Sequence, residues 1–371
     1  MRARRDVLFY VPNVGPLLRP GHELPTGGAE TQIVLVAREL ARRGLRVAIV
    51  VKDAELPSPI DGLDLIHLGP LRTRLPGLRS LEVFARTLLA VRRGGAPVVV
   101  QSNASVETGY VGLAARLTGR RFVFATVNIV DFYFSRLEPT RRRQAGYRGG
   151  VRLAHEVVAQ TAEQVDLARK RFGRDARLVH CAVEPAPRRS GRPESFLWIG
   201  RLAPYKQPHA YLDLAEAVPE AKFSMVGVPT GPDGPRLAAS IAKRAASLPN
   251  VELLAPRARP ALAPLYDSAV AVVNTAEFEG MPNIFLEGWA RGVPALALQH
   301  DPDGMIVRER LGAFAAGDPA RFADQARALW SERGNQHDLE ERCVTHMRKH
   351  HSMTAVADSW VEVLFEDAHH A

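Results

Sequence analysis

The stretch that decides the fold is Thr275-Ala-Glu-Phe-Glu-Gly-Met-Pro-Asn-Ile-Phe-Leu-Glu-Gly-Trp-Ala-Arg-Gly-Val-Pro294. The β-branched apolar run just before it, residues 270–274, is typical of a buried parallel strand. A polar turn over residues 277–280 follows, and a helix is expected over 282–291 because proline suits the first helical turn and glycine follows the end. The carboxyl end of a strand therefore meets a helix N-terminus, whose free backbone N–H groups attract anions.

Two carboxylates flank this helix start, Glu279 in the turn and Glu287 within the helix. Carboxylates accept hydrogen bonds from hydroxyl groups and repel phosphate, so the stretch predicts a ligand that carries both phosphates and sugars. The pattern Glu-Gly-x-Pro-Asn-x-x-x-Glu resembles the Glu-x7-Glu signature of the retaining glycosyltransferases of family 4 (group 1). Two solvated helix glutamates are the plain alternative for such a pattern.

The resemblance implies an α/β protein with the GT-B fold, in which two Rossmann-like doubly wound domains face each other across a cleft. It implies that Glu279 contacts the hydroxyls of the transferred sugar and that Glu287 contacts the ribose of the nucleotide. The donor-binding residues expected in this stretch are Glu279, Gly280, Met281, Pro282, Asn283 and Glu287.

Composition agrees with a two-domain globular enzyme. The chain has 371 residues, of which 46% are hydrophobic, and no apolar run is long enough for a transmembrane helix. The apolar segment near the start of the chain is too short and interrupted for a signal peptide, and two cysteines are too few for a disulfide framework, so a cytoplasmic protein is expected.

The net charge of +9 favours anionic partners such as nucleotides or an anionic membrane. No nucleic-acid-binding motif accompanies the charge, and nucleic acid is not an expected partner.

A second motif lies near the N-terminus, in Thr26-Gly-Gly-Ala-Glu30 at the start of an expected helix. Two glycines there allow a ligand to approach the backbone N–H groups. The motif resembles the family's Gly-Gly-x-Glu, which implies that Gly27 and Gly28 face the donor diphosphate. No Gly-x-Gly-x-x-Gly follows the first strand, which argues against a nicotinamide dehydrogenase.

A third motif opens the second half of the chain, in Gly200-Arg-Leu-Ala-Pro-Tyr-Lys206 after an expected strand. Arginine and lysine at this spacing on one loop can converge on a diphosphate. The match to the family's Gly-Arg-x-x-x-x-Lys motif implies that Gly200, Arg201 and Lys206 bind the donor. Arg201 and Lys206 are then expected to neutralise the diphosphate leaving group.

The expected acceptor side holds Asn128, at a position where many family members carry histidine. Asparagine can hydrogen-bond a sugar hydroxyl but cannot supply imidazole chemistry. Asp131 is the nearest group able to act as a base, with a structural loop residue as the alternative. The expected catalytic residues are thus Arg201, Lys206, Glu279, Asn128 and Asp131.

Alternating strand-like and helix-like segments predict parallel sheets. A linker rich in proline, glycine and arginine at 184–194 separates an N-terminal acceptor-side domain (1–187) from a C-terminal nucleotide-sugar domain (188–350). The last segment (351–371) is expected to be a helix that packs back on the N-terminal domain. Further expectations are an exposed loop or frayed helix at 139–152, a strand at 178–183 and a last strand at 293–298.

Two further segments suggest a membrane contact and a metal site. The segment 71–93 interleaves arginines with leucines and could lie on an anionic membrane, although any surface helix of an arginine-rich protein has the same pattern. His300, Asp301 and Asp303 suggest a metal site, but the family's donor sites generally work without a metal ion, so neither metal nor cofactor is expected.

Together these features predict a retaining glycosyltransferase that moves a sugar from a nucleotide-diphosphate sugar to a hydroxyl of a glycan or lipid-linked acceptor. A bacterial cell-surface polysaccharide or glycolipid pathway is expected from family frequency. Two alternatives remain open: a non-catalytic nucleotide-sugar-binding scaffold, suggested by Asn128, and a GT-B sugar-nucleotide epimerase.

Overall fold

The computed structural model describes residues 5–19, 27–53, 55–73 and 75–366. The chain divides into two compact units. Of the described residues, those up to 182 and those from 353 onward form unit 1, and residues 183–352 form unit 2. The final segment of the chain therefore belongs to the first unit, and the chain passes from unit to unit at 182/183 and 352/353.

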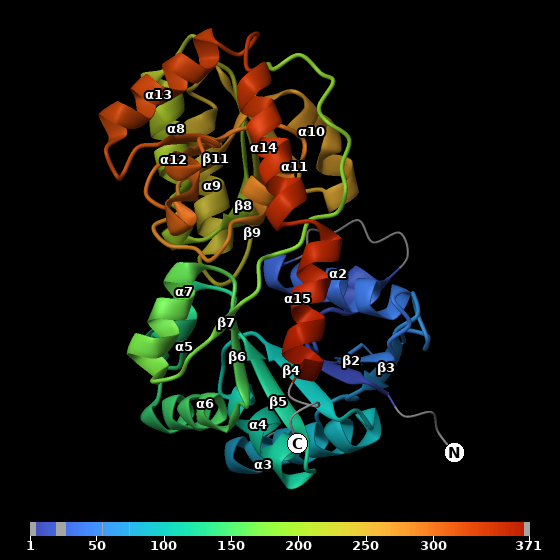
Figure 1. The fold of residues 1–371 in the computed structure, drawn as a ribbon. Coiled ribbons are helices and arrows are strands. Elements are labelled where there is room, and N and C mark those ends of the chain that lie inside the picture. The colour runs from blue at the N-terminus through green and yellow to red at the C-terminus, as the bar shows by residue number, and fades with distance from the viewer. Residues whose placement is uncertain (1–4, 20–26, 54, 74, 367–371) are drawn as a thin grey trace. The chain divides into compact units, whose positions relative to one another are not determined.

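Unit 1 is built on a seven-stranded sheet of order β3-β2-β1-β4-β5-β6-β7, in which every pairing is parallel. The strands are β1 (Val7–Tyr10), β2 (Val47–Val51), β3 (Asp64–His67), β4 (Val98–Ser102), β5 (Arg121–Ala125), β6 (Glu156–Ala159) and β7 (Arg177–Leu178). The helices are α1 (Gly15–Leu18), α2 (Gly28–Arg42), α3 (Pro76–Gly94), α4 (Glu107–Leu117), α5 (Phe134–Leu137), α6 (Arg141–Leu153), α7 (Ala162–Leu167) and α15 (Met353–Phe365). A 3-10 helix, η1 (Ile129–Phe132), and a π-helical turn, η2 (Ala168–Phe172), complete the unit (Figure 1).

Strands β1, β2 and β4 are buried on both faces, which explains why their sequences are largely apolar instead of alternating with polar residues. Alternate side chains enter two different cores. Val7 and Phe9 pack with α2 and α15, whereas Leu8 and Tyr10 pack with α3, α4 and α6. The sheet is thus covered by helices on both faces, as a doubly wound fold requires.

Unit 2 is built on a six-stranded parallel sheet of order β10-β9-β8-β11-β12-β13. The strands are β8 (Ser195–Leu202), β9 (Phe223–Pro229), β10 (Val251–Leu254), β11 (Ala269–Asn274), β12 (Ala295–Ala297) and β13 (Gly312–Phe314). The helices are α8 (Pro208–Ala217), α9 (Gly234–Ala245), α10 (Ala263–Asp267), α11 (Asn283–Ala290), α12 (Met305–Arg308), α13 (Pro319–Ser331) and α14 (His337–His350), with 3-10 turns η3 (Pro204–Lys206), η4 (Arg259–Leu262) and η5 (Pro302–Gly304).

Strand order reverses at β1/β4 in unit 1 and at β8/β11 in unit 2. In an open α/β sheet, ligands bind outside the carboxyl ends of the strands at such a reversal. The topology alone therefore indicates two candidate positions, one on each unit.

Several sequence-based expectations about elements are wrong. Residues 141–153 form the regular helix α6 where a loop or frayed helix was expected. Strand β7 ends at Leu178, well short of 183, and β12 is followed by a further strand, β13. The expected extension of the last helix to His370 lies outside the described residues.

Candidate functional site

The reversal point of unit 2 is framed by two chain segments, which follow β8 and β11. Strand β11 is buried throughout and ends at Asn274, whose Oδ1 accepts a hydrogen bond from the N–H of Ala276 (2.8 Å) and so turns the chain. The turn continues to Pro282 in the N-cap position, and α11 begins at Asn283, one residue later than the sequence predicts. The N-terminus of α11 therefore lies at the carboxyl edge of the sheet.

Lys206 and Glu279 meet at this edge and form an ion pair. Lys206 is supplied by η3 after β8, and Glu279 by the turn after β11. Both side chains are largely buried, with 18% and 10% of their surface exposed. Burial, and secondarily the positive charge of Arg201, lower the pKa of Lys206 to about 7. The Glu279 carboxylate acts in the opposite direction, because a nearby negative charge stabilises the protonated amine.

Neutral contacts hold the two segments in register. Thr275 Oγ1 donates to the carbonyl of Lys206 (2.7 Å) and accepts from Trp198 Nε1 (3.1 Å). The N–H of Glu277 donates to the carbonyl of Tyr205 (2.9 Å). The Tyr205 ring stacks on Phe278 with centroids 5.1 Å apart. These contacts hold the Lys206–Glu279 pair in place. The sequence motifs did not predict them.

Arg201 lies beside this framework and is exposed to solvent. Its Nη2 donates to the hydroxyl of Tyr205 (2.8 Å), which orients the guanidinium group. Gly200 precedes it where any larger residue would press against the Trp198 ring. Arg201 and Lys206 therefore present two cationic groups on one loop, as the sequence predicts.

Glu287 lies on α11, one turn into the helix, and its carboxylate is held on both sides. Oε2 accepts a hydrogen bond from the hydroxyl of Tyr266 (2.7 Å), and Oε1 forms an ion pair with Arg259 Nη2 (2.7 Å). Tyr266 is buried, whereas Arg259 is partly exposed. The carboxylate is therefore fixed in direction, and Arg259, on η4, is a neighbour that the motif did not reveal.

His300 is a further residue that the sequence placed only in a weak metal hypothesis. Its Nε2 lies 3.1 Å from the carbonyl oxygen of Gly280, in the same turn as Glu279. Burial lowers the pKa of His300, so the imidazole is neutral at pH 7. Asp301 accepts hydrogen bonds from the N–H groups of Ile306 and Val307, as a helix cap does. Among the residues that the structure describes, no group of three potential ligands is arranged to hold a metal ion.

On unit 1, the glycine motif lies at the start of α2 as expected. Gly27 is the N-cap residue and Gly28 the first helical residue. The Glu30 carboxylate lies beside Gly27, where a β-carbon would make this flexible side chain turn aside. Glu30 therefore lies against the helix N-terminus, where its negative charge is favourable.

Asn128 and Asp131 form a reciprocal cap on η1 at the end of β5. Asn128 Oδ1 accepts from the N–H of Val130 (3.0 Å), and Asp131 Oδ2 accepts from the N–H groups of Val127 (2.6 Å) and Asn128 (3.0 Å). Asp131 is buried, and burial raises its pKa to about 6. These contacts give both side chains a structural task in shaping the loop.

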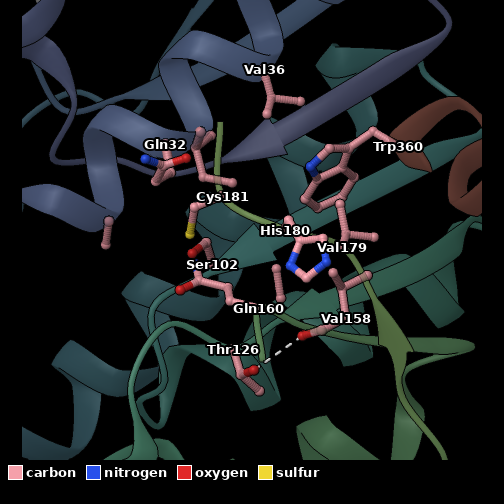
Figure 2. A pocket seen from close by; sticks show the side chains of 13 residues that line it. Gln32, Val36, Ser102, Thr126, Val158, Gln160, Val179, His180, Cys181 and Trp360 are labelled. Carbon is pink, nitrogen blue, oxygen red and sulfur yellow. Dashed lines mark hydrogen bonds between the residues drawn. The ribbon is translucent and has the colours of Figure 1, made fainter. Parts of the chain in front are cut away.

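A small cavity of about 20 Å³ lies at the carboxyl edge of the unit 1 sheet (Figure 2). Its polar lining comes from Gln32 of α2, from Ser102 at the end of β4 and from residues that follow β5, β6 and β7. The full lining is Ala29, Gln32, Ile33, Val36, Ser102, Ala125, Thr126, Val158, Gln160, Val179, His180, Cys181 and Trp360. Gln32 Nε2 donates to the carbonyl of Ala182 (3.0 Å), and Thr126 Oγ1 donates to that of Val158 (3.1 Å). The cavity has room for a water molecule and no more.

The structure therefore gathers Gly200, Arg201, Lys206, Glu279, Gly280, Met281, Pro282, Asn283 and Glu287 around one reversal point on unit 2. Gly27, Gly28, Asn128 and Asp131 lie on unit 1.

Comparisons with known proteins agree with this arrangement. The family model described as Glycosyltransferase Family 4 matches residues 26–186, and the one described as Glycosyl transferases group 1 matches residues 193–332. The D-inositol 3-phosphate glycosyltransferase of Mycobacterium avium (strain 104) is 25% identical over 375 aligned residues, which cover 88% of this chain and 85% of the relative.

Solved structures show the same fold across the chain. Sucrose-phosphate synthase from Thermosynechococcus elongatus aligns with a TM-score of 0.79 at 16% identity, covering 99% of this chain and 100% of that one. The Anabaena protein HepE in complex with UDP-glucose aligns with a TM-score of 0.75 at 13% identity, covering 97% and 99%.

Proposed function

Because the chain belongs to glycosyltransferase family 4, has the GT-B fold and is a glycosyltransferase, we propose that it moves a sugar from a nucleotide-diphosphate sugar to an acceptor hydroxyl with retention of configuration. The acceptor is a glycan or lipid-linked hydroxyl in cell-surface polysaccharide or glycolipid synthesis.

The observation that carries this proposal is the Lys206–Glu279 ion pair at the reversal point of unit 2. A buried cation and carboxylate side by side match the two chemically different parts of a sugar diphosphate. Binding of the diphosphate gives Lys206 a doubly charged partner in place of Glu279. The released carboxylate can then accept hydrogen bonds from the hydroxyls of the sugar.

The proposed step breaks the bond between the anomeric carbon and the diphosphate oxygen. Arg201, Lys206 and the N–H groups at the start of α11 stabilise the negative charge on the leaving group. The acceptor hydroxyl forms its new bond on the same face of the sugar, and its proton goes to the departing phosphate oxygen. Oδ2 of Asp131 accepts two backbone hydrogen bonds, and this step assigns no proton to that carboxylate.

The ribose of the donor is proposed to bind Glu287, which Tyr266 and Arg259 hold in place. The UDP-glucose complex of the Anabaena protein makes UDP-sugars the first donors to test.

The test is a thermal-shift panel of UDP-, GDP-, ADP- and dTDP-sugars with the full-length protein. A ligand that binds only the native state raises the melting temperature according to its saturation. A shift with one nucleotide class, followed by transfer to an acceptor with retained anomeric configuration, supports the proposal. Conversion of the donor to an isomeric sugar nucleotide without acceptor would indicate the epimerase alternative, and binding without turnover or hydrolysis would indicate the scaffold.

We also propose that helix α3 contacts an anionic membrane surface. Leu75, Leu78 and Leu81 in and next to its first turns are exposed by 63%, 54% and 63%, and Arg79 lies among them. An apolar stripe flanked by arginines suits the interface of an anionic bilayer. No helix in the described part of the chain is long and apolar enough to cross a membrane.

A further inference from the structure

Unit 1 carries a second hollow, which the proposed reaction does not use. Its volume is about 230 Å³, and it is lined by Phe134 of α5, by Arg148, Val151 and Arg152 of α6, and by Arg171 and Phe172 of η2. Three of the six lining residues are therefore arginines, and none is acidic.

The arginines of the hollow lack an acidic partner in the described ranges, where Arg148, Arg152 and Arg171 form no ion pair. Three acidic residues on neighbouring elements are engaged elsewhere: Glu138 with Arg143, Glu156 with Arg121 and Asp175 with Arg169. The hollow therefore gathers three exposed guanidinium groups that no described carboxylate pairs with, and such a cluster attracts anions.

Aromatic rings fix two of these guanidinium groups. The Arg148 guanidinium lies over the Phe134 ring with its carbon 4.6 Å from the centroid, and that of Arg171 lies over Tyr133 at 4.9 Å. Phe172 packs between them, 5.5 Å from Phe134. Stacking restrains the guanidinium planes and leaves their N–H edges available as hydrogen-bond donors.

The local backbone contributes to this arrangement. The helix that follows β6 widens into the π-helical turn η2 just where it supplies Arg171 and Phe172. Such widened turns occur frequently at functional sites.

None of the residues that line the hollow belongs to the motifs assigned to the donor. Arg152 lies in the last turn of α6, which leads into β6, and Arg171 lies in η2, which leads into β7, so both come before the amino ends of strands. The aromatic wall lies nearer the expected acceptor side, because Phe134 follows η1 and Phe172 stacks on Phe132 of η1.

We propose that the hollow is a binding site for a phosphate or diphosphate group. One arginine is enough to bind a single carboxylate. Three arginines in one concave surface offer more hydrogen-bond donors and more positive charge, which suits the several oxygens and charges of a phosphate. The volume exceeds that of a phosphate group, and Phe134, Val151 and Phe172 provide apolar walls for the moiety that carries it. This chemistry is shared by soluble phosphorylated molecules and by the headgroups of anionic lipids.

The test uses inorganic pyrophosphate in equilibrium dialysis with the full chain. Arg201→Ala/Lys206→Ala serves as the background, because it removes the cations of the donor loop. We expect saturable binding in that background, and Arg148→Gln/Arg152→Gln added to it should weaken binding at least tenfold. Arg141→Gln/Arg142→Gln, on the same helix and with the same loss of charge, is the matched control and should bind as the background does.

Exposed arginines tolerate these changes, and unaltered melting temperatures would verify that each variant is folded. Equal binding by the Arg148/Arg152 variant and its control would overturn the proposal, as would the absence of saturable binding in the background.

The two possible sources of the phosphate are separated by sedimentation with vesicles of phosphatidylglycerol and phosphatidylcholine at 1:3. Loss of sedimentation in Arg148→Gln/Arg152→Gln, but not in the control pair, would identify a lipid headgroup. Loss of pyrophosphate binding with unchanged sedimentation would identify a soluble phosphorylated ligand. A donor panel without any shift would refute the proposed reaction and leave this result unaffected.

Discussion

At the scale of single residues, the proposed reaction depends most on the buried pair Lys206 and Glu279. We expect Lys206→Ala to lower kcat by about 10²–10³-fold, the usual loss when one stabilising donor of a transition state is removed. Glu279→Gln keeps the shape but removes the charge, and a similar loss is expected. Lys222→Ala, an exposed lysine in the same unit, is the matched control. Full activity in both site variants, measured by release of nucleoside diphosphate, would show that the site is elsewhere.

The lowered pKa of Lys206 predicts that donor binding is linked to proton uptake. In the free protein its pKa is about 7, so at pH 8.5 the amine is mostly neutral. A bound diphosphate raises that pKa, because it stabilises the charged form. Binding at pH 8.5 should therefore take up close to one proton, and affinity should fall as pH rises above 7. Calorimetry in two buffers of different ionisation enthalpy measures the uptake. Lys206→Arg, which stays protonated, should show none, and uptake equal to that of the wild type would contradict the assignment.

The motifs supplied the residues of the proposed donor site but not the neighbours that hold them. Motifs of fixed spacing contain the charged residues Arg201, Lys206, Glu279 and Glu287, together with Gly200 where space is limited. Their partners were not predictable. Arg259 approaches Glu287 from another loop, and the stacking of Tyr205 on Phe278 joins residues that follow different strands. Such contacts depend on the strand order of the sheet, which spacing along the chain does not encode.

At the scale of elements, helix α6 shows why local patterns mislead. The sequence of 141–153 contains Gly146, Gly149 and Gly150, which disfavour a helix, so a loop or frayed helix was expected. The structure uses two of them for close packing against α4. A side chain at Gly150 would overlap the backbone of Thr108 and Gly109, and one at Gly109 would overlap the carbonyl of Gly146. Tertiary packing thus offsets the weak helix propensity.

This packing predicts opposite effects for two neighbouring glycines. Gly150→Ala should destabilise the protein by about 1–3 kcal/mol, because the added methyl group forces α4 and α6 apart. Gly149→Ala, which faces open space, should stabilise it by about 0.5–1 kcal/mol through helix propensity. Chemical denaturation of unit 1, followed by circular dichroism, measures both. A Gly150→Ala variant as stable as Gly149→Ala would show that α6 does not pack closely against α4.

Helix α3 gives a second prediction at this scale. Leu75→Ser/Leu78→Ser/Leu81→Ser should reduce binding to vesicles that contain phosphatidylglycerol by at least tenfold, since three exposed apolar side chains no longer enter the interface. Leu117→Ser on α4, where the leucine is 62% exposed, is the matched control and should leave binding unchanged. Cosedimentation provides the measurement. Equal binding by the triple variant and the control would remove the membrane proposal.

At the scale of the whole molecule, the chain returns from unit 2 to unit 1, where α15 completes the core. Val356, Trp360, Val363 and Leu364 are buried with the first strands, and the Trp360 ring meets Phe9 edge to face at 6.3 Å. Arg43 forms an ion pair with Asp358, which fixes the helix against α2. The core of unit 1 therefore depends on a helix that follows unit 2 in the chain, whereas the core of unit 2 is built from one continuous run of chain.

This organisation predicts that the two units respond separately to core mutations. Trp360→Ala removes a large buried side chain and should destabilise unit 1 by about 3–5 kcal/mol. Trp330→Ala, whose ring packs on Phe196, should instead destabilise unit 2. Scanning calorimetry with the donor nucleotide assigns the transitions, because the ligand of unit 2 raises the melting temperature of that unit. Trp360→Ala should lower the transition that the nucleotide does not raise. A shift of the nucleotide-sensitive transition instead would show that α15 supports unit 2, and the separation of the two cores would then be wrong.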